Sequence, residues 1–366
     1  MPLLVLPAMV GVLVDQAGMS DSIAGWSASL NFFGAAAIGL AMAFRMHHLS
    51  LRQVAVAGLV IAVVADLASA ALVGSGTAFL AARLVAGVGL GAAYVCAASA
   101  FPRYEDYDRG YGLFVTLQFI VSGVGLYLVP VFSDELGARG LFVVFALLDL
   151  LALSFARGLP GKAGASGDAA RKRTEMGILL TLAAIAGIAG FTLFEAANNA
   201  QFTYIERFGV AQGLDEHRIG IALLFASLIG IPGAFAIVLL GHRFGTLRPL
   251  IAGISLAIAG LLVLMAAPSY AGYVAGGCCL GFSWAFCLPY IQSLLADLDR
   301  RGSVIAAGTS LSTLGSAVGP GLAATAVAGG HYARVFMLAI LIFVLALIGF
   351  VISARYRPVP GVAAAP

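Results

Sequence analysis

The chain has 366 residues, of which 61% are hydrophobic and only 10% are charged, and its mean hydropathy is +1.02. Because a soluble domain carries about 25% charged residues, this composition excludes an ordinary water-soluble protein and predicts an integral membrane protein. The net charge of +3 is too small to indicate binding of nucleic acid.

Apolar runs of membrane-spanning length follow one another along the whole chain. A spanning helix needs about 20 mostly apolar residues, whereas the strands of a membrane barrel are alternating segments of about 10 residues. We therefore expect an all-α membrane protein with twelve transmembrane helices, at residues 2–14, 22–44, 53–73, 77–98, 110–132, 140–157, 176–204, 219–240, 249–267, 270–296, 303–328 and 333–353.

The first run, residues 2–14, is too short to cross the hydrocarbon layer at about 1.5 Å per residue. Either the protein begins upstream of Met1, which truncates this first helix, or the helix continues through Asp15 towards Met19. We expect the upstream start. The N-terminus has no basic segment of the kind that opens a cleavable signal peptide.

The longest polar stretch, "RGLPGKAGASGDAARKRTEM" at 157–176, is typical of a flexible linker. It predicts an N-terminal six-helix bundle at 1–157, a cytoplasmic linker at 158–175 and a C-terminal six-helix bundle at 176–366. "VAGVGLGAAY" at 85–94 is echoed by "VAGGCCLGFSW" at 274–284, which indicates that the two bundles are pseudo-symmetric.

The distribution of Lys and Arg predicts the orientation. With a cytoplasmic N-terminus, fifteen of the twenty Lys and Arg residues fall in inner segments, and only Arg139, Arg207, Arg218 and Arg334 fall in outer ones. The remaining one, Arg83, lies inside the fourth span. We expect a multi-pass protein of the inner (plasma) membrane with both termini in the cytoplasm.

Three motifs resemble those of the major facilitator superfamily. They are the loop "GHRFGTLRP" with Gly241, Arg243, Gly245 and Arg248, the fourth-span "RLVAGVGLGAA" beginning at Arg83, and the eleventh-span "GSAVGPG" at 315–321. With twelve spans and a central linker, the resemblance covers essentially the whole chain. It implies two six-helix bundles, solute transport through a site between them, a latch at the basic loop, and a role for the fourth-span Arg in proton coupling or substrate handling.

The sequence departs from the family pattern in three places. The loop at 241–249 lacks the usual acidic residue and has His242 near its place. The corresponding loop of the first half, at 39–53, also has no acid. Span five, which carries a Gly-Pro pair in antiporters of the family, has none here, and this disfavours a drug–proton antiporter of the usual type.

Arg83 and Asp66 lie at similar depth on adjacent antiparallel spans. An arginine at depth in a membrane costs at least about 2.5 kcal/mol, so we expect the two to form an ion pair. The pair is either a fixed salt bridge or a switchable site for protons or substrate. A third acid, Asp149 in span six, is expected to make a structural hydrogen bond to a neighbouring helix.

Glu195 shares one face of the seventh span with Asn198, Asn199 and Phe202, at the i, i+3, i+4, i+7 spacing. A carboxylate beside two amides is costly against lipid, so the spacing favours a cavity in which the carboxyl group binds and releases protons. The alternative is that Glu195 lies in the outer headgroup region and ends the helix. We rank Glu195 first as the coupling residue and the Asp66–Arg83 pair second.

Further polar and aromatic residues of the spans are candidates for lining a substrate cavity, although each alone is more often a packing residue. They are Asn198, Asn199, Gln118, Tyr94, Trp284, Tyr290, Gln292 and Thr313.

The sequence offers no enzyme constellation. None of the five histidines lies within a predicted span, and the "GVGLG" run lacks the βαβ context of a nucleotide-binding loop. We expect no enzyme activity, no cofactor and no metal. The predicted function is secondary active transport of a small organic solute by alternating access, coupled to protons, by a monomer in the lipid bilayer. The alternatives are an uncoupled facilitator or exchanger, and a transporter-like sensor or scaffold that does not transport.

Overall fold

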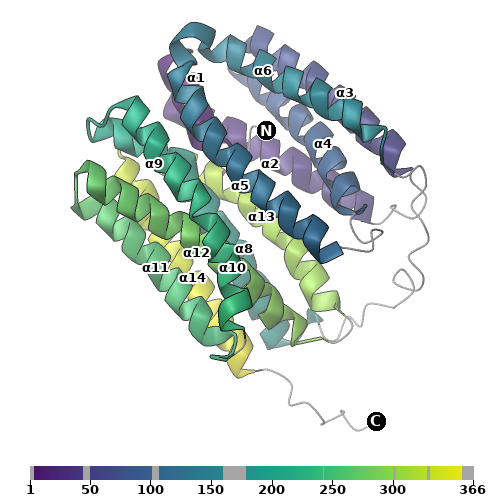
Figure 1. The fold of residues 1–366 in the computed structure, drawn as a ribbon, viewed down its shortest axis with the longest axis vertical. Helices are drawn as coiled ribbons and strands as arrows, with labels where there is room; N and C mark the ends of the chain where they lie inside the picture. Colours follow the sequence, from purple (N-terminus) through teal and green to yellow (C-terminus); the bar gives the residue numbers. More distant parts are fainter. Residues whose placement is uncertain are drawn as a thin grey trace.

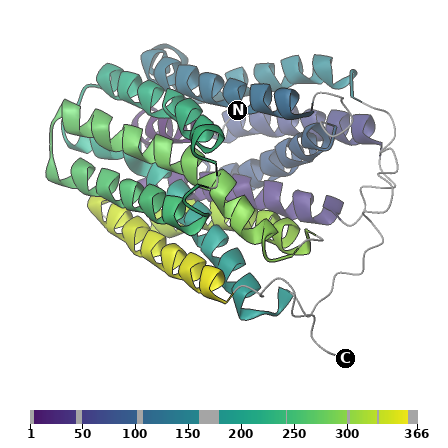
Figure 2. The same cartoon turned by 60° about the horizontal axis from the view of Figure 1, so that its bottom comes forward.

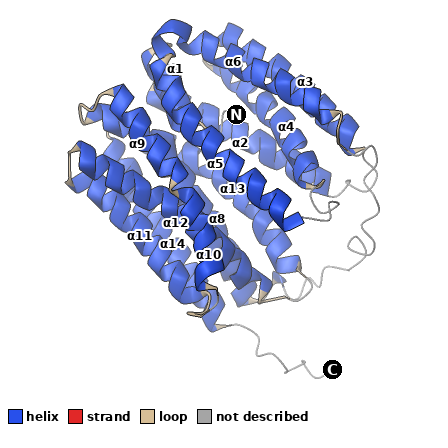
Figure 3. Ribbon diagram, in the orientation of Figure 1, coloured by secondary structure: helices blue, strands red, loops and turns tan. Residues whose placement is uncertain are grey.

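The structure, a computed structural model, describes residues 4–43, 50–100, 107–159, 179–241, 243–299, 302–327 and 330–356. Every long segment within these ranges is an α-helix, and the described residues include no strand (Figure 3). Nearly all of the predicted linker at 158–175 lies outside the described residues, as do Arg45 of the first-half loop and His242.

The helices fall on either side of the predicted linker (Figure 1). The first group consists of α1 (Leu6–Asp15), α2 (Asp21–Ala43), α3 (Leu51–Leu72), α4 (Thr77–Ala98), α5 (Tyr107–Val131) and α6 (Ser133–Ala156). The second group consists of α8 (Leu182–Ala211), α9 (Glu216–Leu228), α10 (Gly230–Leu240), α11 (Leu247–Ala266), α12 (Tyr270–Ala296), α13 (Ser303–Ala326) and α14 (Tyr332–Arg355).

Most packing occurs within each group. In the first group α4 packs against α2 and α3, and α3 packs against α6. In the second group α8 packs against α13 and α14, while α12 packs against α9, α10 and α11. Both views of the ribbon place the purple-to-blue helices of the first group on one side and the green-to-yellow helices of the second on the other (Figures 1 and 2).

The helix bounds lie within a few residues of the predicted spans except in three spans. The sixth begins at Ser133 rather than near residue 140, so Arg139 belongs to α6 instead of an outer loop. The seventh span ends at Ala211 rather than near residue 204, so Glu206 and Arg207 belong to α8 instead of an outer loop. The eighth span is broken at Ile229 into α9 and α10. Pro232 is the third residue of α10, where a proline's missing N–H leaves no helical hydrogen bond unmade, and the break therefore precedes it.

Among the described residues, eight helical segments are long and apolar enough to cross a membrane. Helices α8 and α13, with 30 and 24 residues, are long but fall outside this set, because Ser, Thr, Asn and Gly residues lower their hydropathy. Helices of this kind are better suited to a protein interior than to contact with lipid, and these two pack against each other.

The two groups meet mainly along three pairs of helices. Helix α1 packs against α8, α2 against α13, and α5 against α9. In each pair one helix comes from each group, so a change in any of these contacts alters how the groups fit together.

Candidate functional site

Glu195 lies in the middle of α8 with only 8% of its surface exposed. Its Oε1 accepts a hydrogen bond from the indole Nε1 of Trp284, at 3.3 Å. Its Oε2 accepts one from Oγ of Ser316, at 3.2 Å, and one from Nδ2 of Asn199, at 3.3 Å. The helix-end alternative is therefore wrong: Glu195 is buried, and within the described part of the chain all three of its donors are uncharged.

Close approach of α13 to α8 brings Ser316 to this carboxylate. Gly315 lies against the carbonyl oxygen of Thr192, and Gly319 against that of Ala196, so closely that a Cβ on either glycine would overlap the oxygen. Thr192 and Ala196 flank Glu195 on α8. The "GSAVGPG" motif thus positions Ser316, because small residues let helix backbones approach in membranes.

Trp284 connects the Glu195 carboxylate to the first helix group. Its ring lies edge-on to that of Phe119 on α5, with 5.9 Å between the ring centroids and 75° between the planes. The carbonyl oxygen of Phe119 accepts a hydrogen bond from Oγ of Ser227 on α9, at 2.9 Å. One of the groups that bind Glu195 therefore belongs to the contact between α5 and the second group.

The predicted ion pair between Asp66 and Arg83 is confirmed, and both side chains are fully buried. Nε of Arg83 also donates to Oγ of Ser69, at 3.0 Å, and the guanidinium lies 4.6 Å from the centroid of the Phe142 ring. A carboxylate, a hydroxyl and an aromatic face thus partner this arginine in apolar surroundings.

Asp149 on α6, which was predicted to make a structural hydrogen bond to a neighbouring helix, lies beside this pair. It contacts Asp66 and acts electrostatically on Arg83. Asp66 Oδ2, Arg83 Nη1 and Asp149 Oδ2 each lack a hydrogen-bond partner among the described atoms. The three charges lie on α3, α4 and α6, inside the first group and away from the helices that pack against the second.

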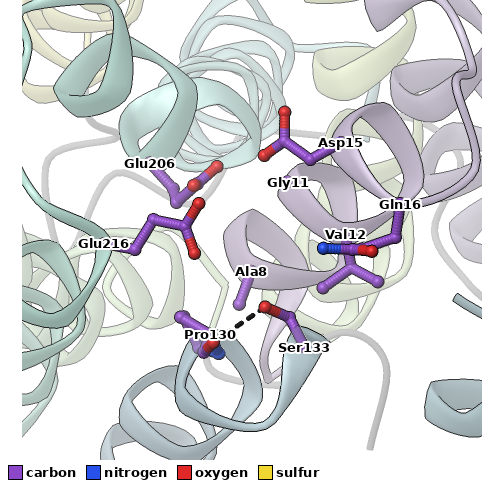
Figure 4. A pocket seen from close by; sticks show the side chains of 9 residues that line it. All are labelled: Ala8, Gly11, Val12, Asp15, Gln16, Pro130, Ser133, Glu206 and Glu216. Carbon is purple, nitrogen blue, oxygen red and sulfur yellow. Dashed lines mark hydrogen bonds between the residues drawn. The ribbon is translucent and has the colours of Figure 1, made fainter. Parts of the chain in front are cut away.

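A third charged cluster was missed by the sequence analysis. The guanidinium of Arg207 on α8 donates to both carboxylate oxygens of Asp15 on α1, at 2.7 and 2.5 Å, and its Nε donates to Glu206 at 2.9 Å. Figure 4 shows Asp15, Glu206 and Glu216 facing the same small pocket. The apolar residues around "ER" at 206–207 in "YIERFGV" are the signal that the helix continues past them.

The same end of the molecule carries two more links between the groups. The hydroxyl of Tyr204 on α8 donates to the backbone oxygen of Asp21, at 2.7 Å, and that of Tyr332 on α14 donates to its carboxylate, at 2.8 Å. We call this end, where α1 passes into α2, the α1–α2 end. Three contacts that involve Asp15 and Asp21 hold the groups together there.

Three of the remaining candidate cavity residues donate their polar hydrogens to backbone carbonyl oxygens. Asn198 donates to the carbonyl of Phe194, the buried Tyr290 donates to that of Gly241, and the exposed Thr313 donates to that of Ser310. These three hydrogen bonds are structural.

Tyr94 on α4 lies near Gln118 on α5, and 54% of the Tyr94 surface is exposed. Gln292 on α12 is also exposed. Of the eight candidates, Asn199 and Trp284 contact Glu195.

A family model described as the Major Facilitator Superfamily matches residues 3–320. The chain belongs to this superfamily. Among solved structures, this chain resembles a crystal structure of the nucleoside transporter NupG (D323A mutant). The two share a TM-score of 0.77 and 14% sequence identity, and the match covers 97% of this chain and 96% of that one. At this identity the likeness shows the fold alone. No curated protein matches.

Membership of the superfamily confirms the family resemblance and decides the broad class. The chain is a multi-pass membrane protein that transports a small-molecule solute, and it is not an enzyme.

In the loop motif at 241–249, two glycines adopt the positive φ angles of tight turns. Gly241, which ends α10, has φ +53°, and Gly245 has φ +71°, both in the region that favours glycine. Arg243 and Arg248 are exposed on either side of Gly245. The motif therefore presents two cations at the end of the molecule opposite the α1–α2 end.

Proposed function

We propose that this transporter couples the movement of a small organic solute to protons by alternating access, with Glu195 as the coupling residue. The observation that carries the proposal is that the Glu195 carboxylate is buried among uncharged donors, one of which contacts the first helix group. The pair of Asp66 and Arg83 ranks second, because it is enclosed within the first group.

The physical basis of coupling is the cost of burying a charge. An ionised carboxylate without a cationic partner costs several kcal/mol to take out of water, and protonation removes most of that cost. A conformation that buries Glu195 is therefore favoured by protonation, and one that wets it is favoured by ionisation. A ligand with different affinities for two states shifts the balance between them, and here the ligand is the proton.

The proposed architecture is two pseudo-symmetric bundles of six spans each, residues 1–157 and 176–366, in which α9 and α10 together form the eighth span. The glycine packing supports it. On α4, Gly87 and Gly91 lie against Asn31 and Ala35 of α2, while on α12 Gly281 lies against Ala226 of α9. The fourth and tenth spans thus use equivalent glycines to approach the second and eighth.

The proposed orientation places both termini in the cytoplasm and the α1–α2 end outside the inner membrane. Arg52, Arg157, Arg243 and Arg355 are exposed at the opposite end, as expected for a cytoplasmic face. In this orientation the contacts of Asp15 and Asp21 close the outer side, and this structure represents the state that is closed to the outside.

Nucleosides are the first solutes to test, because NupG, which has the same fold, is a nucleoside transporter. An uncharged solute also suits a contact region whose central ionisable group is a single carboxyl. The experiment uses proteoliposomes with a trapped pH indicator, to which radiolabelled nucleosides and then other small organic solutes are added.

Uptake of a solute together with a change in internal pH is the expected result. Solute flux without any pH change would establish an uncoupled facilitator and contradict the coupling. No flux of any solute in the panel would favour the sensor or scaffold.

A further inference from the structure

The carboxyl group of Glu195 is connected to the contact between the helix groups by two side chains. We infer that Ser316 and Trp284 are positioning residues that couple the protonation state of Glu195 to the packing of the helices at this contact. The inference rests on the proposed function, because it assumes that Glu195 changes its protonation state during transport.

Ser316 has an acceptor available in either state of Glu195. Its Oγ lies 3.2 Å from Glu195 Oε2 and 3.4 Å from the carbonyl oxygen of Ser312, one turn earlier on α13. When Glu195 is ionised, the hydroxyl donates to the carboxylate. When a proton is added at Oε2, that O–H donates to Ser316 Oγ and the serine hydrogen turns to Ser312, so every hydrogen remains bonded.

Trp284 responds differently, because an indole N–H only donates. Its acceptor, Glu195 Oε1, is charged in the ionised state and neutral in the protonated state. Hydrogen bonds to a charged acceptor are shorter and roughly twice as strong as neutral ones. Protonation therefore loosens the hold on the indole ring, whose edge packs against Phe119 of the first group.

A second contact lies beside Ser316. The carbonyl oxygen of the next residue, Ala317, accepts a hydrogen bond from Oγ of Ser29 on α2, at 2.7 Å. Reorientation of Ser316 thus takes place next to the α2–α13 contact, while release of Trp284 takes place at the α5 contact. Two of the three main helix pairs that join the groups adjoin this carboxyl group.

Glu195 is the group whose titration the inference uses, because the other ionisable groups on the helices packed against α8 lie at helix ends or have other partners. Helix α13 carries none, and those of α1, α2, α9 and α14 lie within the first or last three residues of each helix. On α12, Tyr270 is the first residue of the helix, Tyr273 and Tyr290 donate to the carbonyls of Ile205 and Gly241, and none of the three cysteines donates a hydrogen bond to Glu195. Among the described residues, no charged group acts on Glu195.

The test uses the fluorescence of Trp284. The chain has two tryptophans, so Trp26→Phe leaves Trp284 as the sole indole. We expect its emission in purified, monodisperse protein to change with pH, and we expect Glu195→Gln in this background to abolish that change. Ser316→Ala removes a hydrogen bond that is stronger to the ionised form of Glu195. The midpoint of the pH-dependent change in emission should therefore move to higher pH, by about 0.7 units for a ~5-fold lower acid dissociation constant. Ser316→Thr, which keeps the hydroxyl, should restore it.

The outcomes separate the inference from the proposed function. If Trp284 emission is independent of pH, or if its pH dependence survives Glu195→Gln, the inference is wrong even where Glu195→Gln abolishes proton-driven transport. If emission follows Glu195 but Glu195→Gln transports as the wild type does, the proposed function is wrong and the spectroscopic link stands. An unchanged midpoint in Ser316→Ala would remove Ser316 from the inference.

Discussion

Arg207 on α8 holds Asp15 on α1 by two hydrogen bonds, 2.7 and 2.5 Å long, across the contact between the helix groups. The same guanidinium is held by Glu206 on its own helix, at 2.9 and 3.1 Å. Separation of the groups therefore breaks one ion pair without leaving a buried arginine unpaired. In the alternating-access cycle proposed above, a link of this kind would close the α1–α2 end and still permit it to open.

Removal of the carboxylate at position 15 should favour the open state. Asp15→Asn loses the ion pair, and because Asp15 is 40% exposed the loss is worth about 1 kcal/mol, or a ~5-fold larger open population. Spin labels at positions 17 and 211, in a background without the native cysteines, report the separation as a distance distribution. We expect the fraction of molecules with longer distances between the two labels to increase.

The matched control for this change is Asp134→Asn. Asp134 accepts a hydrogen bond from Gln16, at 2.8 Å, and both residues belong to the first group. Its removal should leave the distance distribution as in the wild type. If Asp15→Asn gives the same distribution as this control, Arg207 does not hold the groups together.

The cluster of Asp66, Arg83 and Asp149 should respond unequally to substitution. Arg83→Met leaves two buried acids without their cation, and loss of one partner of a buried pair costs about 3–5 kcal/mol. Asp149→Asn keeps the ion pair of Arg83 with Asp66 and should cost far less. The apparent melting temperature of purified protein is the measurement. Equal losses in the two variants would show that Asp149 is as necessary to Arg83 as Asp66 is.

Two glycines on α12 form a pair of tests of the helix packing. A Cβ at Gly281 would overlap the carbonyl oxygen of Ala226 on α9, whereas one at Gly277 would lie 3.4 Å from the Ala226 side chain, an ordinary contact. We expect Gly281→Ala to destabilise the protein by about 1–3 kcal/mol through overpacking. Gly277→Ala should be nearly neutral. A reversed order of melting temperatures would mean that α9 and α12 pack in another register.

The bounds of most helices could be predicted from the sequence. The thickness of the bilayer sets the number of apolar residues in a spanning helix, and charged residues or glycines mark the loops between them. Helix α12, for example, has the predicted bounds. The break at Ile229 was not predicted, although Gly230 and Pro232 follow it, because the run stays apolar on both sides of the break. Arg207 was assigned to an outer loop for a related reason: hydropathy does not distinguish a charge in water from one neutralised inside a helix bundle.

The candidate site was predictable within one helix and not between helices. Helical periodicity placed Asn199 beside Glu195, and the two are in contact. Ser316 comes from a helix more than a hundred residues later, and its approach depends on how α13 packs against α8. Tyr290 was predicted to line a cavity, but its hydroxyl is used by a loop carbonyl; which partner a polar group finds depends on tertiary structure.

The most direct test of the central claim, that Glu195 couples solute movement to protons, is transport by Glu195→Gln in proteoliposomes with an imposed pH gradient. Glutamine keeps the shape of the protonated carboxyl group but cannot release a proton. We predict that the variant exchanges labelled for unlabelled solute as the wild type does, and that it no longer accumulates the solute when a gradient is applied. Accumulation at the wild-type level, with the wild-type dependence on pH, would contradict the account.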